Sequence, residues 1–373
     1  MERHHRRALE FLEGLGRRPA VPFHEGPVAR YVVGVLREMG HAASIDAFGN
    51  VLVRYRHPEA PAGSAVALVA HMDHPGFEVT ELRGDVGVAR ALGRVPEASL
   101  RGVFPLRVLT PEGPLAARTE PLEEAGGQRR VLVRFEGPTP AHLPAPAVFD
   151  LVDYALEGEV LRMRALDDLA GCAAILAALE KVALEEAPAD VTAVFTRAEE
   201  GGLFGARLMA QAGTLPRGTA VVSVESSPLI PGVAQGDGPV VRTGDALTTF
   251  DEEAEAALKA AVERLKERDP AFRAQRRLMS GGVCEASAFA AHGYAVTGVA
   301  FPLSNYHNAT TSVTDPDGGV DAEYIRLSDF LAGVDLLAEA AANFHRAGEY
   351  RALDRMGAVS VEVRRRLEGS ADW

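Results

Sequence analysis

Short runs of apolar residues alternate along the chain with longer segments in which apolar residues recur every three or four positions. Runs of the first kind are typical of buried strands, and the second pattern is typical of amphipathic helices. The expected strands cover residues 65–70, 160–166, 191–196, 220–224 and 295–301. The expected helices cover residues 169–184, 254–267 and 324–347. This alternation predicts an α/β fold with a mixed, largely parallel sheet flanked by helices.

The segment from residue 76 to residue 146 interrupts the alternation. It holds many Gly and Pro residues and several short strand-like runs, two of which flank a Pro-Glu-Gly turn at 111–113. We expect this segment to form a small all-β domain inserted into a larger α/β domain made of residues 1–75 and 147–373. The Pro-rich stretch 141–149 is expected to be the linker that returns the chain to the larger domain.

Composition and charge narrow the class of protein. The chain has 373 residues and a net charge of −13, without a long basic tract, which argues against nucleic-acid binding. No apolar run is long enough to span a membrane, and the first residues lack the apolar core of a secretion signal. With only Cys172 and Cys284 there is no disulfide framework, so a cytoplasmic location is expected. The basic cluster near the N-terminus is expected to be the solvated start of a first helix: His4, His5, Arg6 and Arg7.

Acidic and histidine side chains follow each of the expected strands. In chain order they are His71 and Asp73, Asp167 and Asp168, Glu199 and Glu200, Glu225, and His307. Because the carboxyl ends of parallel strands meet at one edge of a sheet, we expect these side chains to lie close together. Carboxylates gathered there without compensation would repel one another and resist desolvation. Divalent metal ions would supply the missing positive charge.

The types of side chain in this group suit a pair of metal ions. Histidine nitrogen and carboxylate oxygen are the usual donors of a catalytic zinc site, and two ions need a bridging carboxylate. Asp73 lies on the same side of its strand as His71 and is placed to hold the far nitrogen of that ring. Of the adjacent Glu199 and Glu200, one can bind metal while the other acts as general base on water.

Each motif also has a simpler interpretation. Asp167 and Asp168 could cap a helix, the two glutamates could form an exposed turn, and His307 could be an ordinary loop histidine. Their conjunction at successive strand ends favours a dinuclear site. The chain lacks the Gly-x-Ser-x-Gly element of serine hydrolases and the glycine-rich phosphate loops. Cys284 is a minor candidate for a nucleophile, and His24 is expected to be a surface or satisfied histidine.

The order of these motifs resembles that of the co-catalytic zinc aminopeptidases and carboxypeptidases. Within that group the chain is most similar to the glutamyl and tetrahedral aminopeptidase family. The similarity is carried by five blocks: DAFGNVLV, ALVAHMDHPGFEV, RALDDLAGCAAIL, FTRAEEGGLFGA and GDGPVVRTGD. They are spread over nearly the whole chain. The inserted segment, which lies between Asp73 and Asp167, agrees with this family, because the carboxypeptidase and deacylase branch has its extra domain before the last histidine.

The resemblance implies a role for each motif residue. Asp167 would bridge two metal ions, with His71 and Glu225 completing one site and Glu200 and His307 the other. Glu199 would be the general base and Asp73 the acid that orients a histidine. The metal would be zinc, with cobalt or manganese as alternatives. The inserted domain would serve as a lid and help to build a homo-oligomer.

Several positions depart from the family pattern. Glu225 stands where aspartate is usual, His74-Pro75 replaces an acid, and His307 lies in PLSNYHNATT without the usual Arg-Tyr. Glu285 also replaces a common aspartate. Together with Asp168, the residues His74 and Glu285 are expected to contact substrate or to support the ligands.

Three functions are compatible with these residues. The first is a metal-dependent hydrolase of amide bonds, an aminopeptidase that acts on peptides. The second is a deacylase or carboxypeptidase that acts on a peptide or small amide with the same two-metal site. The third is a ligand-binding or assembly protein on an old hydrolase scaffold. A requirement for a free α-amine separates the first two, and full metal occupancy without turnover would favour the third.

Overall fold

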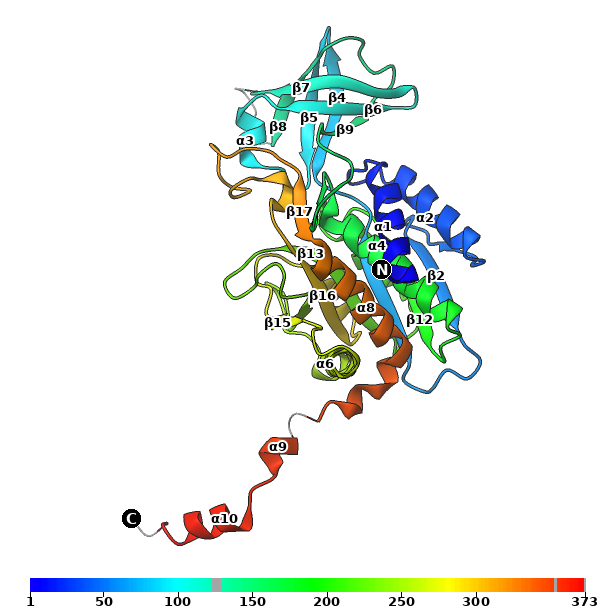
Figure 1. Cartoon of the computed structure of the whole chain (residues 1–373). Helices are drawn as coiled ribbons and strands as arrows, with labels where there is room; N and C mark the ends of the chain where they lie inside the picture. The colour runs from blue at the N-terminus through cyan, green and yellow to red at the C-terminus, as the bar shows by residue number, and fades with distance from the viewer. Residues whose placement is uncertain (123–128, 352–353, 372–373) are drawn as a thin grey trace.

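The computed structural model describes residues 1–122, 129–351 and 354–371. Its larger domain is built around an eight-stranded sheet with the order β1-β2-β12-β3-β13-β16-β14-β15 (Figure 1). The strands are β1 (Ser44–Ile45), β2 (Val51–Arg56), β3 (Ala65–His71), β12 (Asp190–Thr196), β13 (Ala220–Pro228), β14 (Val240–Arg242), β15 (Gln275–Arg277) and β16 (Val296–Leu303). The central strands β12, β3, β13 and β16 are parallel, whereas β2 pairs antiparallel with β12 and β14 pairs antiparallel with β16. The predicted mixed, largely parallel sheet is therefore confirmed.

The central strands are buried on both faces, which explains their continuous apolar runs. Their register also fixes where the polar residues emerge. His71 at the end of β3 pairs with Thr196 at the end of β12. Glu225 lies further along β13, opposite Ala300 of β16. The strand ends thus deliver their polar side chains to one edge of the sheet.

Helices cover both faces of this sheet. The bounds are α1 (Arg3–Gly16), α2 (Gly26–Glu38), α4 (Leu166–Leu184), α5 (Phe204–Ala212), α6 (Glu252–Arg268), α7 (Glu285–Ala290) and α8 (Leu327–Asn343). Helix α4 is buried nearly all round, between the sheet on one side and α1 and α8 on the other. Its many alanines permit this close packing. In the described part of the chain, no helix is both long and apolar enough to cross a membrane.

The inserted segment forms a closed barrel with the order β4-β5-β8-β7-β6-β9. Its strands are β4 (Gly76–Arg83), β5 (Val86–Leu92), β6 (Pro105–Thr110), β7 (Gly113–Glu120), β8 (Arg130–Phe135) and β9 (Ala145–Phe149). Phe77 and Phe149 pack edge to face in its core. The stretch expected to be a linker instead supplies β9, and a short helix, α3 (Glu97–Arg101), was not anticipated. Residues 123–128 of the expected insert lie outside the described residues.

Two expected elements were wrong in extent. The strand expected at 160–166 ends at Met163 and lies outside the main sheet. This strand, β11 (Val160–Met163), pairs instead with β10 (Ala155–Glu157) and β17 (Glu323–Arg326) in a small antiparallel sheet. The helix expected from residue 324 starts at Leu327, because residues 323–326 are held as a strand by β11.

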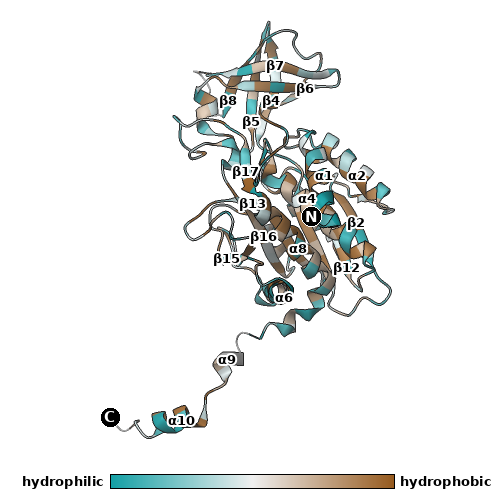
Figure 2. Cartoon of the chain, in the orientation of Figure 1, coloured by the Kyte–Doolittle hydropathy of each residue, from teal (hydrophilic) through white to brown (hydrophobic). Residues whose placement is uncertain are grey.

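The two ends of the chain pack differently against the body of the protein. After the 3-10 helix η2 (Phe344–Glu349), the short helices α9 (Asp354–Gly357) and α10 (Val361–Glu368) form an arm that leads away from the body (Figure 1). Helix α10 buries no side chain and is mostly hydrophilic (Figure 2). At the other end, His4 is buried rather than solvated, and its Nε2 lies 2.6 Å from Asp335 Oδ1 of α8.

Candidate metal centre

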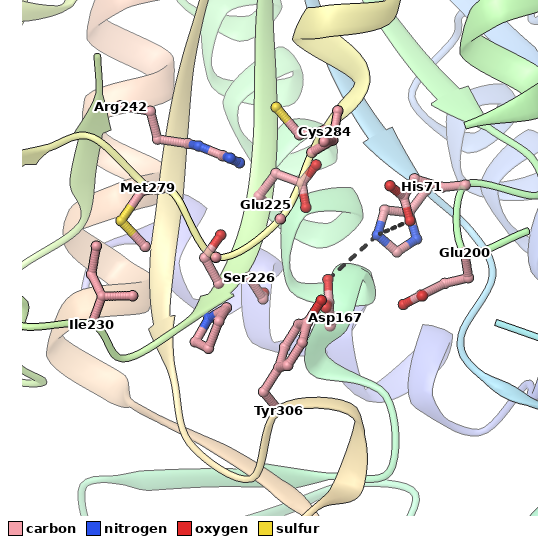
Figure 3. Close-up of a pocket in the computed structure, with 16 residues that line it drawn as sticks. His71, Asp167, Glu200, Glu225, Ser226, Ile230, Arg242, Met279, Cys284 and Tyr306 are labelled. Carbon is pink, nitrogen blue, oxygen red and sulfur yellow. Dashed lines mark ion pairs between the residues drawn. The ribbon is translucent and has the colours of Figure 1, made fainter. Parts of the chain in front are cut away.

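Four of the residues singled out as ligands come from separate elements and line one pocket (Figure 3): His71, Asp167, Glu200 and Glu225. His307 lies beside this lining, with its Nε2 3.0 Å from Glu200 Oε1. His71 ends β3, Glu225 lies in β13, and Asp167 lies in the first turn of α4. Glu199 and Glu200 occupy the turn between β12 and α5. His307 comes from η1 (Tyr306–Asn308), a 3-10 turn after β16. Asp167 was expected at the end of a sheet strand, but it reaches the same edge from the start of a helix.

Of the three candidate donor groups at this centre, one contains His71, Glu199 and Glu200, and the other two share one carboxylate. One of these two contains His71, Asp167 and Glu225, and the other contains Asp167, Glu200 and His307. His71 Nε2 lies 3.4 Å from Asp167 Oδ1, and His307 Nε2 lies 3.6 Å from Asp167 Oδ2. Within each group, the donor atoms lie within 4.8 Å of one another. Asp167 therefore offers one oxygen to each side.

Hydrogen bonds to backbone carbonyl oxygens fix the orientation of the His71 and His307 rings. His71 Nδ1 lies 3.0 Å from the carbonyl oxygen of Asp73, and His307 Nδ1 lies 3.0 Å from that of Arg94. A carbonyl only accepts, so each Nδ1 carries a proton and each ring turns its Nε2 toward a carboxylate. Asp167 Oδ1 and Glu200 Oε1 are buried without a hydrogen-bond partner. Imidazole nitrogens and carboxylate oxygens that face one another in this way are a donor set suited to a cation.

Burial and neighbouring like charges disfavour ionisation of the carboxyl groups in this pocket. Burial raises the pKa of Glu199 well above its usual value, and the neighbouring Glu200 adds to this effect. Burial and the neighbouring Glu285 raise the pKa of Glu225 in the same direction. Burial also acts on Glu200, but the adjacent His307 outweighs it and lowers the pKa. Within the described residues, no lysine or arginine forms an ion pair with these carboxylates, which again indicates a site for cations.

Asp73 lies beside His71, but its carboxylate makes different contacts from those expected. Its two oxygens accept hydrogen bonds from the backbone N–H groups of Glu199 and Glu200, both at 3.0 Å. The distance from Asp73 Oδ1 to His71 Nδ1 is 3.8 Å, too long for a hydrogen bond. Asp73 thus orients the His71 ring through its carbonyl and holds the double-glutamate turn through its side chain.

The three residues expected to contact substrate or support the ligands lie behind the pocket lining. Asp168 caps α4 by accepting a hydrogen bond from Gly171 N–H at 3.1 Å. His74 bridges the carbonyl oxygen of Asp167 and Asn308 Oδ1, at 2.8 and 2.9 Å, and burial lowers its pKa to about 4. Glu285 accepts hydrogen bonds from the hydroxyl groups of Thr196 and Ser223, each at 3.0 Å. None of the three is among the residues that line the pocket.

The sequence analysis missed Glu323, a buried acid in β17. Its Oε2 accepts hydrogen bonds from the backbone N–H groups of Leu166 and Asp167, at 2.7 and 3.0 Å. Its Oε1 accepts from His307 N–H at 2.9 Å. One side chain therefore ties together the backbones of two ligand residues. Residues 324–326 were expected to belong to the helix at 324–347, so no strand was predicted at this point.

Two further residues of the pocket lining were also missed (Figure 3). Tyr306 precedes His307, and its ring stacks on the imidazole with centroids 3.7 Å apart. Arg242 ends β14 and is 3% exposed. No carboxylate in the described part of the chain forms an ion pair with Arg242, and its Nε has no hydrogen-bond partner. The sequence signal for Arg242 was its position at the end of a short apolar run.

Comparisons with known proteins agree with this arrangement. The family model described as M42 glutamyl aminopeptidase matches residues 145–320. A search of curated proteins gave no match. Among solved structures, the aminopeptidase APDkam598 from the archaeon Desulfurococcus kamchatkensis superposes with a TM-score of 0.74 at 22% identity, over 96% of this chain and 99% of that chain.

Two other solved structures show the same fold. The Pyrococcus horikoshii TET1 peptidase gives a TM-score of 0.73 at 20% identity, over 90% of this chain and 99% of that chain. The TET aminopeptidase from the marine sediment archaeon Thaumarchaeota archaeon SCGC AB-539-E09 gives 0.75 at 16% identity, over 92% and 98%. At these identities the structures establish the fold, and the family model adds the sequence match. Together they show that residues 145–320 are similar in sequence to the M42 glutamyl aminopeptidases and that the chain has the fold of these aminopeptidases.

Proposed function

We propose that this chain is a metal-dependent aminopeptidase that holds two divalent cations. The observation that carries the proposal is the pair of donor groups that share Asp167. His71 and Glu225 would complete one metal site, and Glu200 and His307 the other. Nitrogen and carboxylate donors suit zinc, and the same set can hold cobalt or manganese. When bound, the cations would polarise the scissile carbonyl and lower the pKa of a water molecule.

The chain's own residues supply the proton transfers. Glu199 lines the pocket, and its Oε2 lies 3.7 Å from His71 Nε2. Its raised pKa suits a group that accepts a proton from water and then passes that proton to the leaving amine. Asp73 holds the backbone of Glu199 and Glu200, so that the base and the neighbouring ligand keep a fixed spacing.

The residues on the far wall of the pocket favour peptide substrates whose N-terminal residue is acidic. Arg242 lies there beside the apolar side chains of Ile230 and Met279. Because this buried guanidinium has no carboxylate partner in the described residues, the side chain of an N-terminal Glu or Asp would pair with it. The family description as glutamyl aminopeptidases supports this assignment. It also favours an aminopeptidase over the deacylase or carboxypeptidase alternative.

The other features of the proposal follow from relatives. Pyrococcus horikoshii TET1 assembles into a tetrahedron or a large octahedral shell. We therefore propose a homo-oligomer, with the inserted domain of residues 76–146 contributing to its assembly and acting as a lid. A cytoplasmic location is consistent with the two free cysteines, Cys172 and Cys284.

A single peptide experiment tests this function. The zinc-, cobalt- or manganese-loaded protein is incubated with peptides that begin with Glu, Leu or Lys, each with a free or an acetylated N-terminus. Mass spectrometry should show stepwise loss of N-terminal residues from free peptides only, fastest for Glu. Glu199→Gln is the inactive control. Cleavage of acetylated peptides, or cleavage from the carboxyl end, would instead support the deacylase or carboxypeptidase alternative.

A further inference from the structure

Tyr306 lies at the metal centre, but no role follows for it from the donor groups. It lines the same pocket as His71, Asp167, Glu199, Glu200 and Glu225. Its ring lies next to Asp167, on the opposite side of the pocket from Arg242 (Figure 3). Within the described residues, no hydrogen bond is formed by its hydroxyl group. A largely enclosed phenol without a partner has a hydrogen-bond donor available for a bound molecule.

The backbone around Tyr306 is held in an unusual conformation. Asn305, His307 and Asn308 all adopt left-handed φ angles, of 54°, 55° and 65°. Non-glycine residues in this region are strained and persist only where surrounding contacts enforce them. Here His307 N–H donates to Glu323, Asn305 Nδ2 to the carbonyl oxygen of Ala322, and Asn308 Nδ2 to that of Arg164.

This conformation determines where two adjacent side chains point. In an extended chain, neighbours such as Tyr306 and His307 would project to opposite sides. With His307 left-handed, their rings instead stack at an interplanar angle of 26°, and both lie at the metal centre. The stack limits rotation of the phenol, so its hydroxyl is held in place before substrate arrives. Such preorganisation is what an electrostatic catalytic group requires.

Hydrogen-bond donors are scarce on this side of the pocket. The carboxylates of the donor groups can only accept when ionised. The Ser226 hydroxyl is already used, because it donates to the carbonyl oxygen of Leu166 at 3.0 Å. Arg242 lies on the far wall, where it is placed for the substrate side chain. Tyr306 is a protein donor placed beside Asp167, where the reacting carbonyl would lie.

We propose that Tyr306 is a catalytic residue whose hydroxyl donates a hydrogen bond to the oxygen of the scissile carbonyl as that oxygen gains negative charge. The hydroxyl keeps its proton throughout, and no bond to Tyr306 forms or breaks. This inference rests on the proposed peptidase function, because it assigns a donor to the tetrahedral stage of amide hydrolysis. A donor that acts mainly at that stage lowers the barrier without tightening substrate binding.

Tyr306→Phe tests the proposal, since it removes the hydroxyl and keeps the ring that stacks on His307. We expect kcat to fall roughly 10- to 100-fold with KM unchanged, somewhat less than the loss of a sole oxyanion donor, because the cations share the charge. Metal content, measured by mass spectrometry, should stay at the wild-type value. The matched control is Tyr324→Phe, whose ring lies over Arg162 away from the pocket, and it should leave kcat unchanged.

A binding measurement separates this role from a structural one. Calorimetry should show that Tyr306→Phe weakens binding of a phosphinic dipeptide, which imitates the tetrahedral stage, by about the same factor as kcat. Binding of the free amino acid product should not change. Wild-type kcat in Tyr306→Phe, a rise in KM alone, or equal weakening of both ligands would overturn the proposal. If the wild type cleaves no peptide, the function itself fails, and a difference in phosphinate binding still reports on the hydroxyl.

Discussion

The α/β domain and the inserted barrel differ in whether their acidic side chains are paired with arginines. In the barrel, acidic side chains pair with arginines at or near the surface, as Glu120 does with Arg134 and Glu81 with Arg83. At the edge of the main sheet, Asp167, Glu199 and Glu225 are largely buried and form no ion pair with an arginine or lysine of the described residues. In the described part of the chain, none of the metal-suited groups includes a barrel residue. A domain that buries carboxylates without partners depends on a cation from outside the chain.

The barrel nevertheless contacts the centre through its backbone. The carbonyl oxygen of Arg94, just after β5, lies 3.0 Å from His307 Nδ1. Glu97 N–H donates to the carbonyl oxygen of Val313 in the loop that follows His307. The barrel thus helps to position one ligand, and the α/β domain supplies the ligands themselves.

Asp167→Ala should have the largest effect, because both proposed metal sites share this side chain. We expect activity to fall by at least about 10³-fold and the metal content to drop below two ions per chain. Elemental analysis after dialysis and a peptide assay check both. Asp85→Ala, which removes an exposed barrel acid, is the control and should change neither. Retention of two tightly bound ions by Asp167→Ala would contradict the shared-ligand assignment.

Glu199→Gln should separate proton transfer from metal binding. The amide keeps the shape of the side chain but cannot accept the proton from water, so kcat should fall about 10²- to 10⁴-fold. Metal content should remain as in the wild type. A barrel change, Glu112→Gln, serves as the comparison in the same assay. If Glu199→Gln instead loses metal, Glu199 is a ligand and the two glutamates exchange roles.

Glu323→Gln should lower metal affinity only because the ligand residues Asp167 and His307 are held less firmly in position. The amide can accept at only one of its two terminal atoms, so it cannot hold the N–H groups of Leu166, Asp167 and His307 together. We expect metal affinity to fall roughly 10-fold, with most activity restored at saturating metal. Competition with a chromogenic chelator measures this. The control is Glu78→Gln, a buried barrel acid paired with His24 and Arg90, and it should leave metal affinity unchanged.

The smallest expected effect is a dependence of thermal stability on pH. Burial raises the pKa of Asp73 to about 7 and also raises those of Glu199 and Glu225. The folded metal-free protein therefore binds more protons than the unfolded chain, and its stability should fall from pH 5.5 to pH 8. For a chain of this size, each kcal/mol lost lowers the melting temperature by about 2 °C.

Metal should reverse this trend. Cations bind the ionised carboxylates, so the stabilisation gained on adding zinc should be larger at pH 8 than at pH 5.5. Thermal melts with and without metal at both pH values provide the measurement. A metal-free protein that becomes more stable toward pH 8 would contradict the picture of uncompensated acids at the sheet edge.

Sequence reasoning found the parts of this molecule that depend on local pattern. The central strands were identifiable because they are buried on both faces, and His71 and Glu225 followed directly from those strands. The pairing of β11 with β17 was not identifiable, because it joins segments about 160 positions apart. The same distance hid Glu323, whose partners Leu166 and Asp167 are 157 and 156 positions away. The left-handed backbone around Tyr306 also left no clear signal, since asparagine and histidine occur in many other conformations.

The edges of the main sheet affect how the protein behaves when it is concentrated. An exposed edge strand offers unpaired backbone groups to other molecules and can seed aggregation. Here the sheet ends in β1 and β15, of only two and three residues. Strand β15 also carries Arg276 and Arg277. The barrel, being closed, has no edge strand. Two β-rich domains are thus joined in one chain with little backbone on which a foreign strand could add.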